Sequence, residues 1–105
     1  MYDIESIQAQ YASHAAEYSQ HFRIRMKERN IKFADVRMVI QSGEIIEQDL
    51  QDIPNPSVLI LGYTRDNKPL HVAIGMDDAK LVLITAYFPN LIRWESDYKT
   101  RKVVD

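Results

Sequence analysis

Three apolar stretches joined by two short polar turns fill residues 57–88, which read SVLILGYTRDNKPLHVAIGMDDAKLVLITAYF. The stretches at 57–64, 70–76 and 80–88 are rich in β-branched and aromatic side chains, which is typical of β-strands. Their connections are too short to contain a crossover helix, so we expect consecutive strands to run antiparallel, as a meander. Ile45 and Ile46 predict one more strand before them, which gives a four-stranded antiparallel sheet.

Helices are expected on the N-terminal side of this sheet. From Ile4 to about Arg29 the sequence contains neither Gly nor Pro and is dominated by good helix formers, which predicts one long helix or two helices with a break near 13–19. A further helix is expected over about 33–42, with Gly43 as a left-handed C-terminal cap. The predicted fold class is α+β, with N-terminal helices packed on one face of the sheet. Residues 94–101 fit either a short helix or a strand.

The composition is that of one domain without cysteine chemistry. A chain of 105 residues has room for a single core, and the absence of cysteine excludes disulfides, Cys-based zinc sites and Cys nucleophiles. No apolar run approaches the roughly 20 residues that span a bilayer, and the N-terminus lacks the basic and apolar regions of a signal peptide. We therefore expect a cytoplasmic protein with no membrane contact.

The net charge of −2 conceals two basic blocks. Six basic residues face two acidic ones between Arg23 and Arg37, and four face three from Arg93 to the C-terminus. If the fold brings the two blocks together they form a surface suited to phosphate, and if it does not they are solvated faces.

A polar stripe within the first block is a candidate for chemistry. His21, Arg25 and Arg29 recur at every fourth residue, so one helix face can hold an imidazole and two guanidiniums in a row. Such a row can bind a phosphate and exchange a proton near neutral pH. The alternative is an ordinary amphipathic helix whose arginines pair with Glu28 or Asp35.

His71 is a second candidate because it lies outside the apolar row of its strand. Leu70, Val72 and Ile74 alternate with it, so His71 points to the opposite face of the sheet. A turn centred on Asp66-Asn67 would place His71 opposite Gly62, and one register of the next hairpin places Thr85 and Tyr87 beside it. The alternative is a structurally satisfied histidine. Three scattered histidines without acidic partners make a poor metal site, and no phosphate-loop or cofactor motif occurs, so we expect neither metal nor cofactor.

Several blocks along the chain occur together in a recognisable order. They are His21, Arg25-Met26, Glu28-Arg29, Ile31, Asp35-Val36, Gly43, Pro56-Ser57, Leu61-Gly62-Tyr63, Pro69-Leu70-His71-Val72, Ile84-Thr85-Ala86-Tyr87, Pro89, Trp94 and Arg101-Lys102. This order resembles the bacterial family called domain of unknown function 4258, which is similar in fold to the RelE and BrnT types of small ribonuclease toxin, within a wider group that includes barnase. The resemblance divides the chain into an N-terminal helical extension at 1–18, one domain at 19–102 and a tail at 103–105.

What the resemblance implies is a toxin-like, metal-independent endoribonuclease with its site on the exposed sheet face. It nominates His21, Arg25, His71 and Tyr87 as catalytic and Arg29, Arg101 and Thr85 as substrate-binding residues. Such cleavage needs a base for the 2′-hydroxyl, cations for the phosphate and an acid for the departing oxygen. The alternative is a non-catalytic RNA- or protein-binding module.

The expected partners are RNA, an antitoxin or another protein, and a second copy of the chain. The homodimer rests on an apolar face of the first helix, where Ile4, Ile7 and Tyr11 are spaced for one side of a helix.

Overall fold

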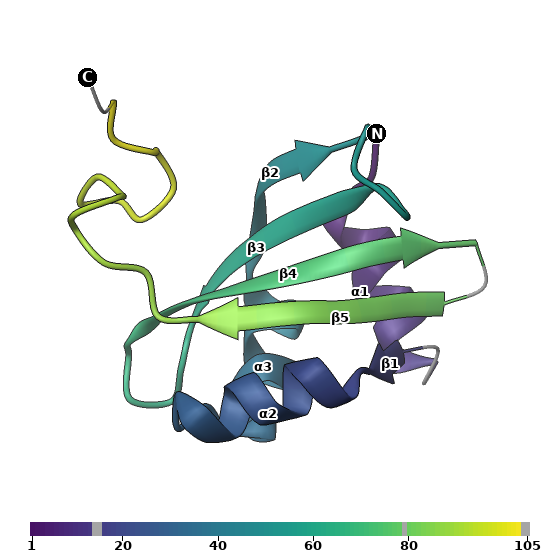
Figure 1. The fold of residues 1–105 in the computed structure, drawn as a ribbon, viewed down its shortest axis with the longest axis horizontal. Helices are drawn as coiled ribbons and strands as arrows, with labels where there is room; N and C mark the ends of the chain where they lie inside the picture. Colours follow the sequence, from purple (N-terminus) through teal and green to yellow (C-terminus); the bar gives the residue numbers. More distant parts are fainter. Residues whose placement is uncertain (14–15, 79, 104–105) are drawn as a thin grey trace.

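The computed structural model describes residues 1–13, 16–78 and 80–103 of the chain (Figure 1). Within these residues three helices and five strands follow one another. The helices are α1 (Ile4–Ala12), α2 (Gln20–Glu28) and α3 (Phe33–Ser42), and the strands are β1 (Ala16–Tyr18), β2 (Glu44–Asp49), β3 (Ser57–Tyr63), β4 (Pro69–Asp77) and β5 (Lys80–Tyr87). The α+β class is thereby confirmed, and of the two alternatives for residues 4–29, two helices with a break is the one observed.

The sheet differs from the prediction by one strand. Its order is β1-β5-β4-β3-β2, in which β2 to β5 form the predicted antiparallel meander and β1 pairs in parallel with β5. The prediction of a four-stranded antiparallel sheet is therefore wrong in the number of strands and in the type of sheet. The break between α1 and α2 contains three extended residues that pair with the edge of β5, from Ala16 opposite Leu81 to Tyr18 opposite Leu83. The prediction missed β1 because three residues between two helices carry no strand periodicity.

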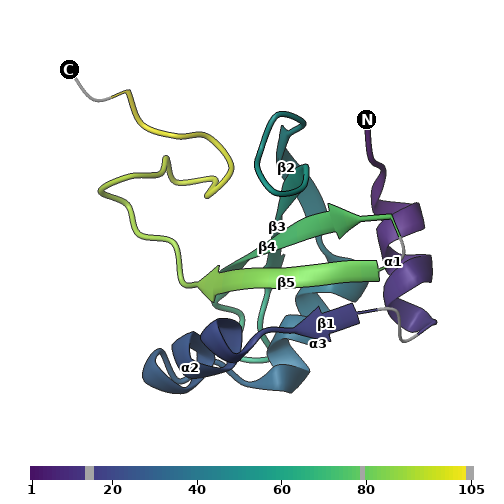
Figure 2. The same ribbon diagram turned by 45° about the vertical axis from the view of Figure 1, so that its right-hand side comes forward.

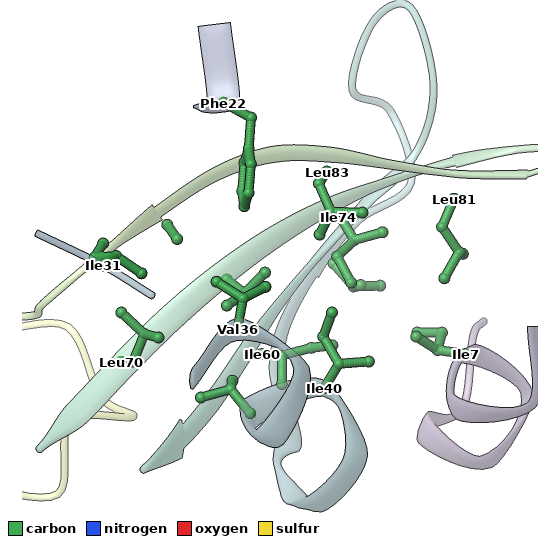
Figure 3. Close-up of a cluster of buried hydrophobic side chains, with 14 of the residues drawn as sticks. Ile7, Phe22, Ile31, Val36, Ile40, Ile60, Leu70, Ile74, Leu81 and Leu83 are labelled. Atoms are coloured by element: carbon green, nitrogen blue, oxygen red, sulfur yellow. The ribbon is translucent and has the colours of Figure 1, made fainter. Parts of the chain in front are cut away.

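The helices and the C-terminal segment lie on opposite sides of the sheet (Figures 1 and 2). The helix side holds the core, which Figure 3 shows between the sheet and the helices; its members include Ile7, Phe22, Val36, Ile40, Ile60, Leu70, Ile74, Leu81 and Leu83. Ile7 is fully buried there, with Ile4 and Tyr11 packed against the same cluster. The apolar face of α1 is thus covered within the chain, so the spacing that motivated a homodimer is explained by intramolecular packing.

The helix ends are set by local capping. The side chain of Asp3 accepts a hydrogen bond from the Ser6 amide at the start of α1, and Ser19 does the same for Phe22 in α2. Gly43 ends α3, but its φ of −85° is not left-handed, so the predicted capping conformation is wrong. A Cβ at this position would lie 2.4 Å from the Val39 carbonyl oxygen, and this close approach is what requires glycine.

The turn between β3 and β4 sets the position of His71 along the sheet. The Thr64 amide donates to the Lys68 carbonyl and Asn67 has a left-handed φ of 61°, so Tyr63 pairs with Pro69 and His71 pairs with Leu61. The predicted pairing with Gly62 is wrong by one residue, because the five-residue loop at 64–68 is centred on Asp66 and not between Asp66 and Asn67. The hairpin between β4 and β5 confirms the predicted neighbours of His71, since Tyr87 lies opposite His71 and Thr85 lies opposite Ala73.

Residues after β5 form a closed loop in place of the helix or strand that we considered. Trp94 and Arg101 make an isolated bridge, and the Asp97 carboxylate accepts from the amides of Lys99 and Thr100 to shape the turn between them. Trp94 is buried, whereas most of the loop is exposed. No helix within the described residues is long and apolar enough to cross a membrane.

Candidate functional site

A shallow cavity of about 320 Å³ opens on the side of the sheet away from the helices. It lies between β2, β5 and the C-terminal loop, with the start of β3 and the middle of β4 as its floor. The lining combines ionisable, polar and apolar side chains: Glu47, Gln48, Asp49, Ser57, Val58, Leu59, Ala73, Thr85, Tyr87 and Arg101. Three of the residues nominated from the sequence, Thr85, Tyr87 and Arg101, therefore share one cavity.

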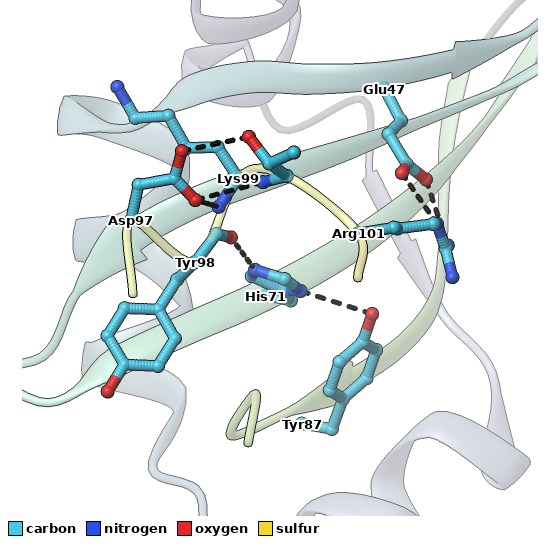
Figure 4. A network of polar contacts seen from close by, with 8 residues as sticks. Glu47, His71, Tyr87, Asp97, Tyr98, Lys99 and Arg101 are labelled. Carbon is cyan, nitrogen blue, oxygen red and sulfur yellow. Dashed lines mark hydrogen bonds and ion pairs between the residues drawn. The ribbon is translucent and has the colours of Figure 1, made fainter. Parts of the chain in front are cut away.

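His71 lies beneath one wall of this cavity. The ring is fully buried, and its two nitrogens contact the Tyr87 hydroxyl at 3.1 Å and the Tyr98 carbonyl oxygen at 2.7 Å (Figure 4). A carbonyl oxygen can only accept a hydrogen bond, so Nε2 of His71 carries a proton. Burial lowers the pKa of His71, which keeps the ring neutral at pH 7 and leaves Nδ1 as an acceptor. Tyr87 consequently donates its hydroxyl proton to His71.

Burial acts on Tyr87 in the opposite sense. It raises the pKa of the Tyr87 phenol, an effect that the positive charges of Arg101 and Arg29 partly offset. Tyr87 is therefore protonated near neutral pH. When it gives its proton away, it must either receive another proton or remain as a phenolate beside Arg101 and Arg29. The result is a directed chain of hydrogen bonds from the cavity through Tyr87 and His71 to the Tyr98 carbonyl.

The C-terminal loop completes the surroundings of His71. The Trp94 ring meets the imidazole edge to face, with ring centres 4.5 Å apart. Tyr98 has a left-handed φ of 59°, which costs a residue with a Cβ about 1–2 kcal/mol. This strained backbone directs its carbonyl oxygen at Nε2 of His71, so the loop conformation and the protonation state of the ring depend on each other.

Arg101 and Glu47 form a two-point ion pair at the cavity. Nε and one terminal nitrogen of the guanidinium donate to the two carboxylate oxygens at 2.6 and 2.9 Å, and the guanidinium stacks 4.7 Å from the centre of the Trp94 ring. About 60% of the Arg101 side chain is exposed, so an anion from solvent can reach it. The guanidinium presents the planar donor geometry that also binds phosphate.

Sequence reasoning missed Glu47. Strict alternation from Ile45, whose partner Ile60 belongs to the core, would turn Glu47 toward the core as well. A bulge between the two residues shifts the register, so Glu47 pairs with Leu59 and lines the cavity instead. Nothing in the sequence of β2 signals this bulge.

Arg29 reaches the edge of the site from the end of α2. One of its terminal nitrogens donates to the Thr85 hydroxyl at 3.1 Å and to the Ala86 carbonyl oxygen at 2.9 Å. β1 pairs only with residues 81–83 of β5, so the rest of that edge has no strand partner in β1. Arg29 provides a hydrogen-bond donor to the backbone of this open part of β5. Its positive charge is thereby held next to Thr85, which lines the cavity.

His21 and Arg25 are not brought to the cavity. Arg25 pairs with Glu28 of the same helix at 3.1 Å, the ordinary helix pairing that we considered as the alternative, and His21 is exposed on α2. Neither residue lines the cavity or bonds to the described residues that do. The predicted stripe is split, and only Arg29 reaches β5. Across the described ranges, no three acidic or histidine side chains lie close enough together to hold a metal ion.

Comparison with known proteins identifies a family. Residues 18–88 match the model of the family described as domain of unknown function (DUF4258), so the chain belongs to that family. The matched segment includes Arg29, Glu47, His71, Thr85 and Tyr87 and ends before the C-terminal loop that supplies Trp94 and Arg101. No curated protein and no solved structure matches the chain significantly.

Proposed function

We propose that this member of the DUF4258 family is a toxin-like, metal-independent endoribonuclease, related in fold to the RelE and BrnT types, with RNA as its substrate and the sheet cavity as its active site. The observation that carries the proposal is the directed hydrogen bond from Tyr87, which lines the cavity, to the buried and neutral His71. A phenol connected to a protected basic nitrogen can relay a proton away from a substrate hydroxyl without a metal.

The proposed reaction uses that relay as its base. Tyr87 takes the proton of the RNA 2′-hydroxyl as its own proton passes to Nδ1 of His71, and the Tyr98 carbonyl stabilises the resulting imidazolium through Nε2. The 2′ oxygen forms a bond to phosphorus and the bond from phosphorus to the 5′ oxygen breaks. Water at the open rim protonates the departing oxygen, and the imidazolium returns its proton to solvent through Tyr87. The products are a 2′,3′-cyclic phosphate and a 5′-hydroxyl end.

Two arginines supply positive charge for the phosphate in this scheme. Arg101 binds the phosphate in place of the Glu47 carboxylate, an exchange that costs little because a half-exposed ion pair is weak. Arg29, held at Thr85, adds a second charge at the β5 edge. Charge that develops on the phosphate oxygens is stabilised by such fixed donors more than by water.

The test is cleavage of a single-stranded oligoribonucleotide at low salt with EDTA present. We expect products that end in a cyclic phosphate, and a loss of about 10²–10⁴-fold in rate for Tyr87→Phe, the range for general acid–base groups. Arg101→Gln should lose a similar factor. Tyr63→Phe and Arg65→Gln are matched controls, because both side chains are exposed and lie outside the cavity lining. Wild-type protein that cleaves no faster than Tyr87→Phe would overturn the proposal.

Complete burial of His71 favours a second candidate, a non-catalytic module that binds RNA or a protein. Both of its nitrogens already have partners within the chain, as in a purely structural histidine. In that case the protein binds RNA with a steep salt dependence and cuts no strand. The same oligonucleotide, followed by both binding and cleavage, separates the two functions.

A further inference from the structure

A second cavity, on the other side of the molecule, has a different chemical character. It has a volume of about 500 Å³ and lies between the end of α1, the edge strand β1 and α3. Among the residues that the structure describes, its lining includes Tyr11, Ala12, Ala16, Tyr18, Arg37 and Gln41. We call it the α1/α3 groove, and neither the family match nor the proposed nuclease site gives it a role.

Hydrogen-bond donors dominate the α1/α3 groove. Among the described residues that line it, none carries a carboxylate, in contrast to the sheet cavity with Glu47 and Asp49. The Arg37 side chain makes no ion pair with any residue that the structure describes. Gln41 uses its backbone carbonyl to accept from Gln8, and its side-chain amide has no partner in that part of the chain. An uncompensated guanidinium beside a free amide is suited to an anion.

The two tyrosines contribute one more donor. Their hydroxyls are hydrogen bonded to each other, which occupies one of the two hydroxyl protons. The second proton is therefore available to a ligand. Tyr11 and Tyr18 line the groove and are half-buried, with Ala12 and Ala16 beside them, and the Tyr18 ring also packs against Phe22 and Phe33.

The charge around the groove accounts for part of the first basic block. The two acidic residues of that basic block form ion pairs away from the groove, Glu28 with Arg25 and Asp35 with Arg65. Arg23 lies 5.6 Å from the centre of the Tyr18 ring and adds a second cation. Glu17, next to Tyr18 in β1, is paired with Lys80. The positive charges of Arg23 and Arg37 thus meet at Tyr18 without a carboxylate partner in the described residues.

We propose that the α1/α3 groove binds a nucleotide, with the phosphate on Arg37 and Gln41 and the base against the tyrosine rings and alanines. A volume of about 500 Å³ exceeds what a lone phosphate fills and falls in the range of small-molecule sites. The ligand is either a free nucleoside 5′-monophosphate or the 5′-terminal nucleotide of an RNA strand. The site is separate from the sheet cavity and does not depend on nuclease activity.

The test is calorimetric titration of the full chain with five probes: AMP, adenosine, inorganic phosphate, and a short oligoribonucleotide in two forms, with a 5′-phosphate or a 5′-hydroxyl end. We expect AMP or the 5′-phosphorylated strand to bind more tightly than adenosine or phosphate alone. AMP that binds more tightly than either strand identifies a free nucleotide as the ligand, and a 5′-phosphorylated strand that binds more tightly than both AMP and its 5′-hydroxyl counterpart identifies an RNA end. No binding of AMP together with equal binding of the two strands, or inorganic phosphate binding as tightly as AMP, would overturn the proposal.

Variants locate the binding. Arg37→Gln should weaken binding roughly tenfold or more, the usual loss for a charged hydrogen bond, whereas Arg93→Gln, an exposed arginine in the C-terminal loop, should have no effect. Tyr18→Phe keeps the ring and removes a hydroxyl, and it should weaken binding less than Arg37→Gln. Equal affinity of Arg37→Gln and wild type contradicts the assignment. Tyr87→Phe should leave AMP binding unchanged, so that failure of the nuclease proposal and failure of this one are distinguishable.

Discussion

Replacing Tyr87 with Phe removes the hydroxyl that donates to His71 and leaves its ring otherwise intact. The His71 side chain is completely buried, and every buried side-chain nitrogen and oxygen of the described residues has a hydrogen-bond partner. Nδ1 of His71 would become a buried acceptor without a donor, which costs about 1–3 kcal/mol. We expect Tyr87→Phe to lower the free energy of unfolding by that amount, equivalent to a fall of about 4–8 °C in melting temperature per kcal/mol.

A double-mutant cycle isolates this hydrogen bond. His71→Leu removes the acceptor at similar volume, so the hydroxyl at Tyr87 should matter less in its presence, and the two changes should couple by about 1 kcal/mol. Urea unfolding can be followed by the fluorescence of the single tryptophan, Trp94, which is buried against the His71 ring. Additivity of the two substitutions within about 0.3 kcal/mol would refute the hydrogen bond from Tyr87 to His71.

Four further predictions use the same unfolding and binding measurements. Burial lowers the pKa of His71 below its usual 6.5, so the folded protein binds fewer protons at His71 than the unfolded chain does. The contribution of His71 to stability is therefore present above pH 6.5 and is lost as the pH falls through the folded pKa. The slope is at most about 1.4 kcal/mol per pH unit, and His71→Leu should abolish it. Glu47→Gln should leave stability within about 1 kcal/mol and raise RNA affinity at low salt, because it frees Arg101; unchanged or weaker affinity contradicts the exchange of carboxylate for phosphate. Gly43→Ala should lower the free energy of unfolding by about 1–3 kcal/mol, because the new Cβ would contact the Val39 carbonyl. Gly75→Ala, whose Cβ would meet nothing closer than 3.4 Å, should cost much less, and equal effects of the two substitutions would argue against that contact. Ile7→Ala should cost about 2–5 kcal/mol without changing the sedimentation of the protein, and a change in oligomeric state instead would restore the homodimer hypothesis.

Local patterns predicted much of the fold because the signal lies within one strand or helix. Alternation in residues 70–76 placed His71 on the face opposite Leu70 and Val72, and it also allowed Thr85 and Tyr87 to be expected beside it. Phe22 and Met26, four residues apart on α2, are both buried in the core, as the period of a helix requires. Such patterns report which side of an element is buried, since the side chains repeat with the period of the backbone.

Features that depend on contacts between distant segments were not predictable in this way. The parallel pairing of β1 with β5, the five-residue loop at 64–68 and the bulge that turns Glu47 toward the cavity each change a register, and register is set by the neighbouring strand. The stripe of His21, Arg25 and Arg29 shows the same limit, because only Arg29 lies where it can reach the edge of β5.

The sequence by itself determined the α+β class, the meander of β2 to β5, the span of α3 and the residue types available for chemistry, because propensity and periodicity are properties of short segments. Only the tertiary structure decided which of those residues meet. The C-terminal loop folds back over the sheet so that Trp94, Tyr98 and Arg101 surround His71 and Tyr87. The end of α1, β1 and α3 bring the exposed Arg37 beside Tyr11 and Tyr18. These groupings join residues far apart in the chain, and their geometry follows from how the layers pack.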